Sequence, residues 1–397
     1  MGKIMLRSLL IGVCFTLLAS PLAHANALNK FSELKNAGIL VVDTQGRRLL
    51  SDNRNRAFIP ASTTKIVTAW LALNRWGEQH RFNTDFYYDQ QQAKLWVKGS
   101  GDPFLVSEEL SSIALQLQQR GISHVATLAL DTSAFTAGLV LPGTSKTNNP
   151  YDAVPSALAA NFNTVNLRTV NGRIRSAETQ TPLTPIAKSL ARGFKKKKIR
   201  VNTGRDPKVA ERYFGELFLA LLKKQGVTHD NRIVFEQSPA KAPFYQHKNS
   251  KTLGDMIRPM MKYSTNFIAN QLALIMTAEH LGRPASVRDV QQYMEGTLKA
   301  NFNWENITFK EGAGLSRSNR ISPVQLVELL ERFRQWRHLL PEVEKGVFAK
   351  SGTLKKVSTL AGYIVDGGQW KPFALMMNQS VPYKLRNRIA KELRQTL

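Results

Sequence analysis

The chain has 397 residues, 43% of them hydrophobic, and a formal net charge of +26 at pH 7. This length suits about two domains, and the hydrophobic content excludes a chain that is disordered throughout. A single cysteine excludes a disulfide scaffold, and the seven scattered histidines form no His-Glu-x-x-His motif. The sequence therefore predicts a globular protein with no metal ion and no cofactor.

The N-terminal segment, residues 1–25, has the pattern of a secretory signal peptide. Lys3 and Arg7 form a charged start, residues 8–22 are predominantly apolar, and Ala23-His24-Ala25 offers a small-x-small cleavage site. We expect the mature protein to begin near Asn26 and to be periplasmic.

The first chemical motif is Ser62-Thr63-Thr64-Lys65. It follows Pro60 and precedes an apolar run, residues 66–73, which predicts a buried helix that begins at the serine. The i, i+3 spacing sets Lys65 beside the Ser62 hydroxyl, and unpaired N–H groups at a helix start favour a developing oxyanion. This arrangement is typical of an activated nucleophile. For the tetrapeptide alone, a capping serine and an ordinary lysine are the commoner explanation.

The middle of the chain carries weaker signals. The apolar side chains of residues 85–88 and 94–97 alternate with polar ones or lie in clusters, which predicts strands. Residues 209–224 carry apolar side chains at i, i+3, i+4 spacing, which predicts a helix. Ser264-Thr265-Asn266 lies where two helical patterns meet, and a capping serine explains that position equally well.

Three consecutive strands are predicted near the C-terminus. They cover residues 350–354, 360–365 and 373–377, and the turn at Asp366-Gly367-Gly368 separates the last two. The following residues, Tyr383 to Leu397, predict a basic helix that packs on this sheet.

The first of these strands carries Lys350-Ser351-Gly352-Thr353. Lys350 and Gly352 share one strand face, and a peptide laid along the edge would collide with any side chain at Gly352. The hydroxyls of Ser351 and Thr353 can bind a carboxylate. The N–H groups of Thr353 and Ser62 can form an oxyanion hole. For the motif alone, a strand-end glycine beside a solvated lysine is an equal alternative.

The combination of the three motifs, in this order, resembles the low-molecular-mass class C penicillin-binding proteins, a family of D-alanyl-D-alanine carboxypeptidases and endopeptidases. The resemblance covers nearly the whole mature chain. Four further segments support it: Gly99-Ser100-Gly101-Asp102-Pro103, Leu130-Asp131-Thr132-Ser133-Ala134-Phe135, Gly312 to Pro323, and Leu360-Ala361-Gly362-Tyr363.

The resemblance implies an acyl-enzyme mechanism on peptidoglycan stem peptides. Ser62 would attack the carbonyl after the penultimate D-Ala, and Lys65 would take the serine proton. Ser264 with Lys350 would pass a proton to the leaving amine. Asn266 would hold the substrate amide.

The resemblance also implies that two residues outside the motifs recognise the diaminopimelate side chain of the stem peptide. The matching positions are Asp152 and Arg317. From the sequence alone, a turn aspartate and a surface ion-pairing arginine explain them at least as well.

Motif spacing, read with the resemblance, predicts an α+β fold. We expect a β-lactamase/transpeptidase-like catalytic domain, an antiparallel sheet flanked by helices, built from residues 26–82 and 246–397. Ser62 and Ser264 stand 202 positions apart, so an inserted domain is expected at residues 83–245.

The sequence departs from the family pattern at four places. Thr265 replaces the usual aspartate and Ser351 replaces the usual threonine, and neither change removes a required functional group. Lys355 stands where the family often has an uncharged residue. The interval from Arg317 to Lys350 lacks an Asp-Gly-Thr-Leu stretch, and the substrate range could differ as a result.

Two alternative functions keep the same fold: a catalytically silent peptidoglycan-binding protein, and a β-lactamase, whose Glu-x-x-Leu-Asn motif is missing here. The expected partners are stem peptides, β-lactam antibiotics as covalent inhibitors, and anionic wall polymers or membranes near Lys195-Lys196-Lys197-Lys198. Nucleic acid is not expected, because no binding motif occurs.

Overall fold

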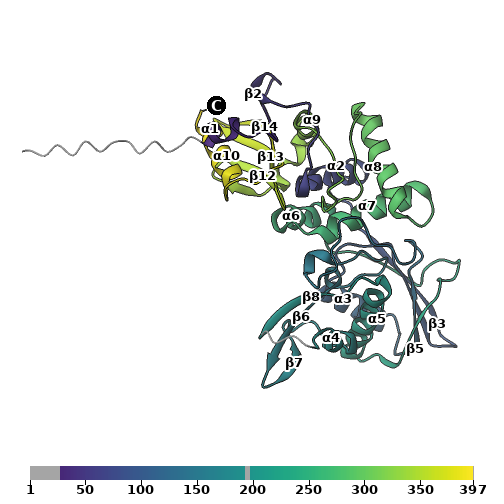
Figure 1. Ribbon diagram of the computed structural model, residues 1–397. Coiled ribbons are helices and arrows are strands. Elements are labelled where there is room, and N and C mark those ends of the chain that lie inside the picture. The colour runs from purple at the N-terminus through teal and green to yellow at the C-terminus, as the bar shows by residue number, and fades with distance from the viewer. Residues whose placement is uncertain (1–26, 193–196, 397) are drawn as a thin grey trace, which may run out of the picture.

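The computed structural model describes residues 27–192 and 197–396. The predicted signal peptide, residues 1–25, lies outside the described residues, as do Lys195 and Lys196 of the basic run. Figure 1 shows two parts of the molecule, one around the sheet that contains the N- and C-terminal strands and the other around β3, β5 and α5.

The first part is built on a six-stranded antiparallel sheet in the order β11-β12-β13-β14-β1-β2. Its strands are β1 (Ala37–Val42), β2 (Arg48–Asp52), β11 (Glu342–Glu344), β12 (Val347–Leu354), β13 (Val357–Asp366) and β14 (Gln369–Met377). The three predicted C-terminal strands are confirmed as β12, β13 and β14. Gly367 and Gly368 both have positive φ, which the tight turn between β13 and β14 requires.

Helices cover both faces of this sheet. Phe373 and Leu375 of β14 pack on one face with the C-terminal helix α10 (Leu385–Thr396) and with α1 (Ala27–Ser32). Ala374 and Met376 point to the other face, toward α2 (Thr64–Trp76) and α9 (Pro323–Phe333). This alternation confirms the α+β class and the predicted packing of the basic C-terminal helix on the sheet.

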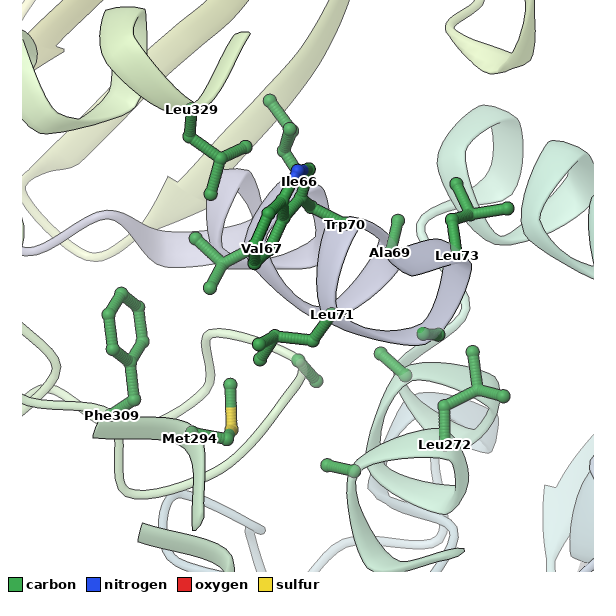
Figure 2. Close-up of a cluster of buried hydrophobic side chains, with 14 of the residues drawn as sticks. Ile66, Val67, Ala69, Trp70, Leu71, Leu73, Leu272, Met294, Phe309 and Leu329 are labelled. Carbon is green, nitrogen blue, oxygen red and sulfur yellow. The ribbon is translucent and has the colours of Figure 1, made fainter. Parts of the chain in front are cut away.

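The helix α2 is the centre of the larger hydrophobic core. Every residue from Thr64 to Leu73 is buried, among the helices α6 (Leu253–Tyr263), α7 (Asn266–Leu281) and α8 (Val287–Phe302) and the 3-10 helix η4 (Arg334–Leu339). Figure 2 shows this environment, with Leu272, Met294, Phe309 and Leu329 around Ile66, Val67, Trp70 and Leu71. Each fully buried aliphatic side chain stabilises the fold by about 1.5–3 kcal/mol, so the start of α2 is firmly anchored.

The second part holds two further sheets. The five-stranded sheet has the order β10-β3-β4-β5-β9 and the three-stranded sheet the order β7-β6-β8. The strands are β3 (Asn83–Asp89), β4 (Lys94–Lys98), β5 (His124–Asp131), β6 (Thr164–Val170), β7 (Arg173–Ser176), β8 (Lys198–Asn202), β9 (Thr228–Phe235) and β10 (Tyr245–Lys248). The helices are α3 (Ser107–Gln119), α4 (Pro185–Leu190) and α5 (Pro207–Lys224), with two 3-10 turns, η2 (Pro150–Asp152) and η3 (Asn161–Asn163).

The elements predicted in this region are confirmed as β3, β4 and α5, the last because Phe214, Leu217, Phe218 and Leu221 bury one helix face. The expected division at residues 83–245 stays a prediction. The strand β10 pairs with β3, so the sheet extends to Lys248. Over residues 27–192 and 197–396, the helices fall short of the length and hydrophobicity that membrane crossing demands.

Candidate active site

Ser62 lies in the 3-10 turn η1 (Ala61–Thr63), directly before α2. Thr63 Oγ1 donates to Pro60 O at 2.8 Å and Thr64 Oγ1 donates to Ala61 O at 2.9 Å. These two hydrogen bonds from the threonine hydroxyls stabilise the turn that carries Ser62. The N-cap of α2 is Thr63. The alternative interpretation of Ser62 as a capping serine is therefore wrong, and its half-buried hydroxyl is left for other contacts.

Lys65 is fully buried one turn further along, and its Nζ lies 3.1 Å from Ser62 Oγ. Nζ also lies 2.7 Å from Asn266 Oδ1 and 2.7 Å from Ala313 O. A neutral amine has two N–H donors and one lone pair. It can donate to Asn266 and Ala313 and still accept the hydroxyl proton of Ser62.

Burial lowers the pKa of Lys65 well below its ordinary value, and the positive charge of Lys350 lowers it further. The carboxylate of Glu311 acts in the opposite direction. The net result favours an uncharged Lys65, which is the protonation state that a general base requires.

The second motif joins two helices. Ser264 adopts the left-handed conformation, with φ 57°, at the end of α6, Thr265 is the N-cap of α7, and Asn266 is the first residue of α7. Asn266 accepts from Lys65 through Oδ1, and its Nδ2 donates to Tyr151 O at 3.0 Å. Asn266 therefore connects the amine of α2 to the loop around η2.

The third motif lies along β12. Val347 and Phe348 pair with β11, and no strand in the described part of the chain pairs with the outer edge of β12 from Lys350 onward. The Lys350 side chain is 2% exposed, and its Nζ donates to Ser351 O at 2.7 Å. Burial, with a smaller contribution from the charge of Arg386, lowers the pKa of Lys350 to about 8.

Gly352 is required here for a reason that the sequence did not reveal. A Cβ atom at this position would lie 2.7 Å from Pro60 O and 2.9 Å from Ser62 N, and it would also strike Thr359 Oγ1. A side chain at this position would therefore collide with the nucleophile turn, and the expected collision with substrate stays a prediction. Glycine allows β12 and the Ser62 turn to touch.

A cavity of about 870 Å³ opens where these elements meet. Ser62, Ser264, Asn266 and Thr353 line it. Residues 149–152 of the second part, with Arg200, line another side of the cavity. Phe104 and Phe162, whose ring centroids are 5.2 Å apart, line it as well. The predicted residues of all three motifs are thus gathered at or directly behind one cavity.

The two predicted recognition residues differ in their surroundings. Asp152 lines the cavity, is 5% exposed, and accepts from Ser145 N at 3.1 Å and from the Thr147 hydroxyl. Arg317 is exposed and donates to Lys355 O at 3.0 Å, at the end of β12. The structure therefore brings Asp152 into the cavity with the motifs and leaves Arg317 beside the strand end.

Sequence reasoning missed two charged residues near the site. Glu311 is fully buried and accepts from Ala313 N (2.8 Å), Gly314 N (2.9 Å), Ser316 N (3.1 Å) and Asn319 Nδ2 (2.9 Å). It holds the loop whose Ala313 carbonyl accepts from Lys65. The other residue is Arg386 of α10, which donates to Gly352 O at 2.6 Å. Nothing in the local sequence of α10 marks it.

Comparison with known proteins agrees with this geometry. Residues 22–341 match the D-Ala-D-Ala carboxypeptidase 3 (S13) family. The D-alanyl-D-alanine carboxypeptidase DacB of Haemophilus influenzae is 25% identical, and the match covers 94% of this chain and 92% of that protein. The chain therefore belongs to the S13 family of serine-type D-Ala-D-Ala carboxypeptidases, as the motifs predicted.

Solved structures confirm the predicted transpeptidase-like fold. Penicillin-binding protein 4 of H. influenzae superposes with a TM-score of 0.73 at 22% identity, covering 93% of this chain and 97% of that one. The same protein complexed with a β-lactam gives a TM-score of 0.70. A predatory peptidoglycan endopeptidase from Bdellovibrio bacteriovorus gives 0.55 at 16% identity, with 91% and 92% of the chains covered.

Proposed function

We propose that Ser62 is the nucleophile of a two-step acyl transfer on peptidoglycan stem peptides. Its Oγ attacks the carbonyl carbon of the penultimate D-Ala while its proton passes to Lys65 Nζ. The peptide C–N bond breaks, the leaving amine takes a proton through Ser264 and Lys350, and water then hydrolyses the ester.

The single observation that carries this proposal is the environment of the Lys65 amine. It is fully buried, lies 3.1 Å from Ser62 Oγ, and has Asn266 and Ala313 as its other partners. Both partners are acceptors, so both N–H groups of a neutral amine are used and its lone pair is directed at the serine. An ordinary surface lysine would have none of these constraints.

The oxyanion of the tetrahedral intermediate is proposed to accept from the backbone N–H groups of Ser62 and Thr353. The close approach of Gly352 to Ser62 N supports this pairing, because Thr353 is the next residue of β12. The N–H groups at the start of α2 add a favourable dipole.

Substrate recognition is proposed to involve the predicted residues of the cavity wall and of the β12 edge. Ser351 and Thr353 hydroxyls would bind the terminal carboxylate, and Asp152 and Arg317 would bind the diaminopimelate side chain. Cleavage of peptidoglycan crosslinks is included in this proposal, because the Bdellovibrio protein of similar fold is a peptidoglycan endopeptidase.

A periplasmic location, cleavage of residues 1–25 and acylation by β-lactams belong to the same proposal. A β-lactam complex of the H. influenzae relative supports the last point. Peripheral contact with anionic wall polymers or membranes stays a prediction. Lys197 and Lys198 of the basic run are exposed, as that contact requires.

The test is incubation with benzylpenicillin followed by intact-mass measurement. We expect one stable adduct on the wild type and none on Ser62→Ala, with muropeptide digests showing loss of terminal D-Ala and cleavage of dimers. A folded wild type that forms no adduct and cleaves no muropeptide would identify a silent wall-binding protein. Rapid turnover of penicillin without a stable adduct would identify a β-lactamase.

A further inference from the structure

The guanidinium of Arg386 reaches from the C-terminal helix to the substrate edge of β12. Its Nη1 donates to Gly352 O at 2.6 Å and to Thr353 Oγ1 at 2.7 Å. Arg386 stands in the first turn of α10, beside Leu385, which packs into the sheet. The apolar face of α10 therefore fixes the origin of this side chain.

Thr353 stands between two cavities. It lines the cavity that holds Ser62, and it also lines a second cavity of about 420 Å³, whose wall includes Arg386. Arg386 lines only the second of these two cavities and contacts Thr353 from there.

The contact determines what the Thr353 hydroxyl can do. A hydroxyl has one donor and two acceptor lone pairs, and here Oγ1 already accepts from a cation. Its single hydrogen is therefore left to donate to another group, and Thr353 is exposed and lines the cavity that holds Ser62. A carboxylate oxygen is the strongest natural acceptor for such a donor.

The charge of Arg386 lacks a counter-ion. Within residues 27–192 and 197–396, no carboxylate forms a salt bridge with Arg386, and its guanidinium is partly buried, which lowers its pKa. A partly buried cation without an anion is unfavourable, and an anionic ligand at the β12 edge would remove that cost.

We propose that Arg386 is a positioning residue that orients the Thr353 hydroxyl toward the C-terminal carboxylate of the bound peptide and supplies positive charge behind it. It thereby favours substrates that end in a free carboxylate over those whose terminus is neutral. The inference rests on the proposed function and assigns a specificity determinant to the same site.

The test compares two substrates, a stem-type peptide ending in D-Ala-D-Ala with a free carboxylate and the same peptide with a C-terminal amide. For Arg386→Gln we expect kcat/KM on the carboxylate to fall roughly 10- to 100-fold, the range of one charge-assisted hydrogen bond, and kcat/KM on the amide to change less than about threefold. Arg386→Lys should restore part of the difference. Arg388→Gln, which removes an exposed charge from the same helix, should match the wild type.

Two further measurements separate orientation from a structural role. Thr353→Val should lower the carboxylate preference to a similar extent, and the double variant should lose little more than either single one. The alkaline limb of the kcat/KM profile should move to higher pH in Arg386→Gln, because the Arg386 charge helps to lower the pKa of Lys350. Arg386 is the charged group that lowers the pKa of Lys350, and the charge of Lys350 in turn lowers the pKa of Lys65.

If Arg386→Gln lowers kcat/KM equally on both substrates, the contact is purely structural and the proposal is wrong. The proposal is also wrong if the ratio of kcat/KM on the carboxylate to kcat/KM on the amide is the same as in the wild type. If Arg386→Gln fails to fold, the Thr353→Val ratio decides the question in the same way. A wild type that neither forms the penicillin adduct nor cleaves either peptide would refute the proposed function instead, and this inference with it.

Discussion

The contact between Gly352 and the nucleophile turn makes a substitution at this position a direct test of the active-site geometry. In Gly352→Ala the new Cβ would lie 2.7 Å from Pro60 O and 2.9 Å from Ser62 N, where ordinary contacts begin at 3.4 Å. The Ser62 turn must therefore move by about 0.5–0.7 Å, since β12 is fixed by its pairing with β13, and the Thr359 side chain must also move away from the new Cβ.

The expected effects follow from this displacement. A misplacement of about 1 Å at a catalytic group costs on the order of 100-fold in rate, so we expect acylation by a fluorescent penicillin to slow roughly 10- to 100-fold. Overpacking should also lower the free energy of unfolding by about 1–3 kcal/mol. The acylation rate is measured with a fluorescent penicillin at saturating and subsaturating concentrations, and stability by urea unfolding.

Gly296 offers a matched control. It lies inside α8, and a Cβ there would meet nothing within 4 Å. Gly296→Ala should leave acylation unchanged and raise the free energy of unfolding by up to about 1 kcal/mol, because alanine is the better helix former. If a folded Gly352→Ala is acylated at the wild-type rate and only long peptide substrates are affected, the original interpretation of a cleared substrate path is correct and the contact argument fails.

Two further predictions concern ionisation. Lys350 has a pKa of about 8, so kcat/KM should fall above pH 8 if the leaving amine takes its proton from Lys350. Lys350→Arg should move this alkaline decline of kcat/KM to higher pH. If the decline stays at the same pH, Lys350 is not its cause. Burial raises the pKa of Glu211 from 4.5 to about 8, so the native protein binds the carboxyl proton more tightly than the unfolded chain does. The contribution of this proton to the free energy of unfolding is therefore fully present below pH 4.5 and is lost as the pH rises to about 8. In Glu211→Gln the loss of stability between pH 5 and pH 8.5 should be smaller than in the wild type by as much as about 4 kcal/mol, measured by urea unfolding at both pH values. Equal losses in the two proteins would contradict the assignment.

The reaction class could be predicted before any fold was known. The order of the three motifs along the chain identifies it, and these motifs contain Ser62, Lys65, Ser264, Asn266 and Lys350. The local elements could be predicted as well. Apolar runs separated by glycine pairs specify β13 and β14, and helical spacing specifies α5, because these patterns depend only on near neighbours along the chain.

The distant groups that complete the site became visible only once the chain was folded. Glu311 acts through the loop that carries Ala313, and Arg386 reaches β12 from a helix 34 positions beyond Gly352. The periodicity of a sequence does not reveal contacts between distant residues. These contacts arise because α10 packs on a sheet in which β1, near the N-terminus, pairs with β14, near the C-terminus. The requirement for Gly352 has the same origin, since only packing brings Pro60 and Ser62 against that strand.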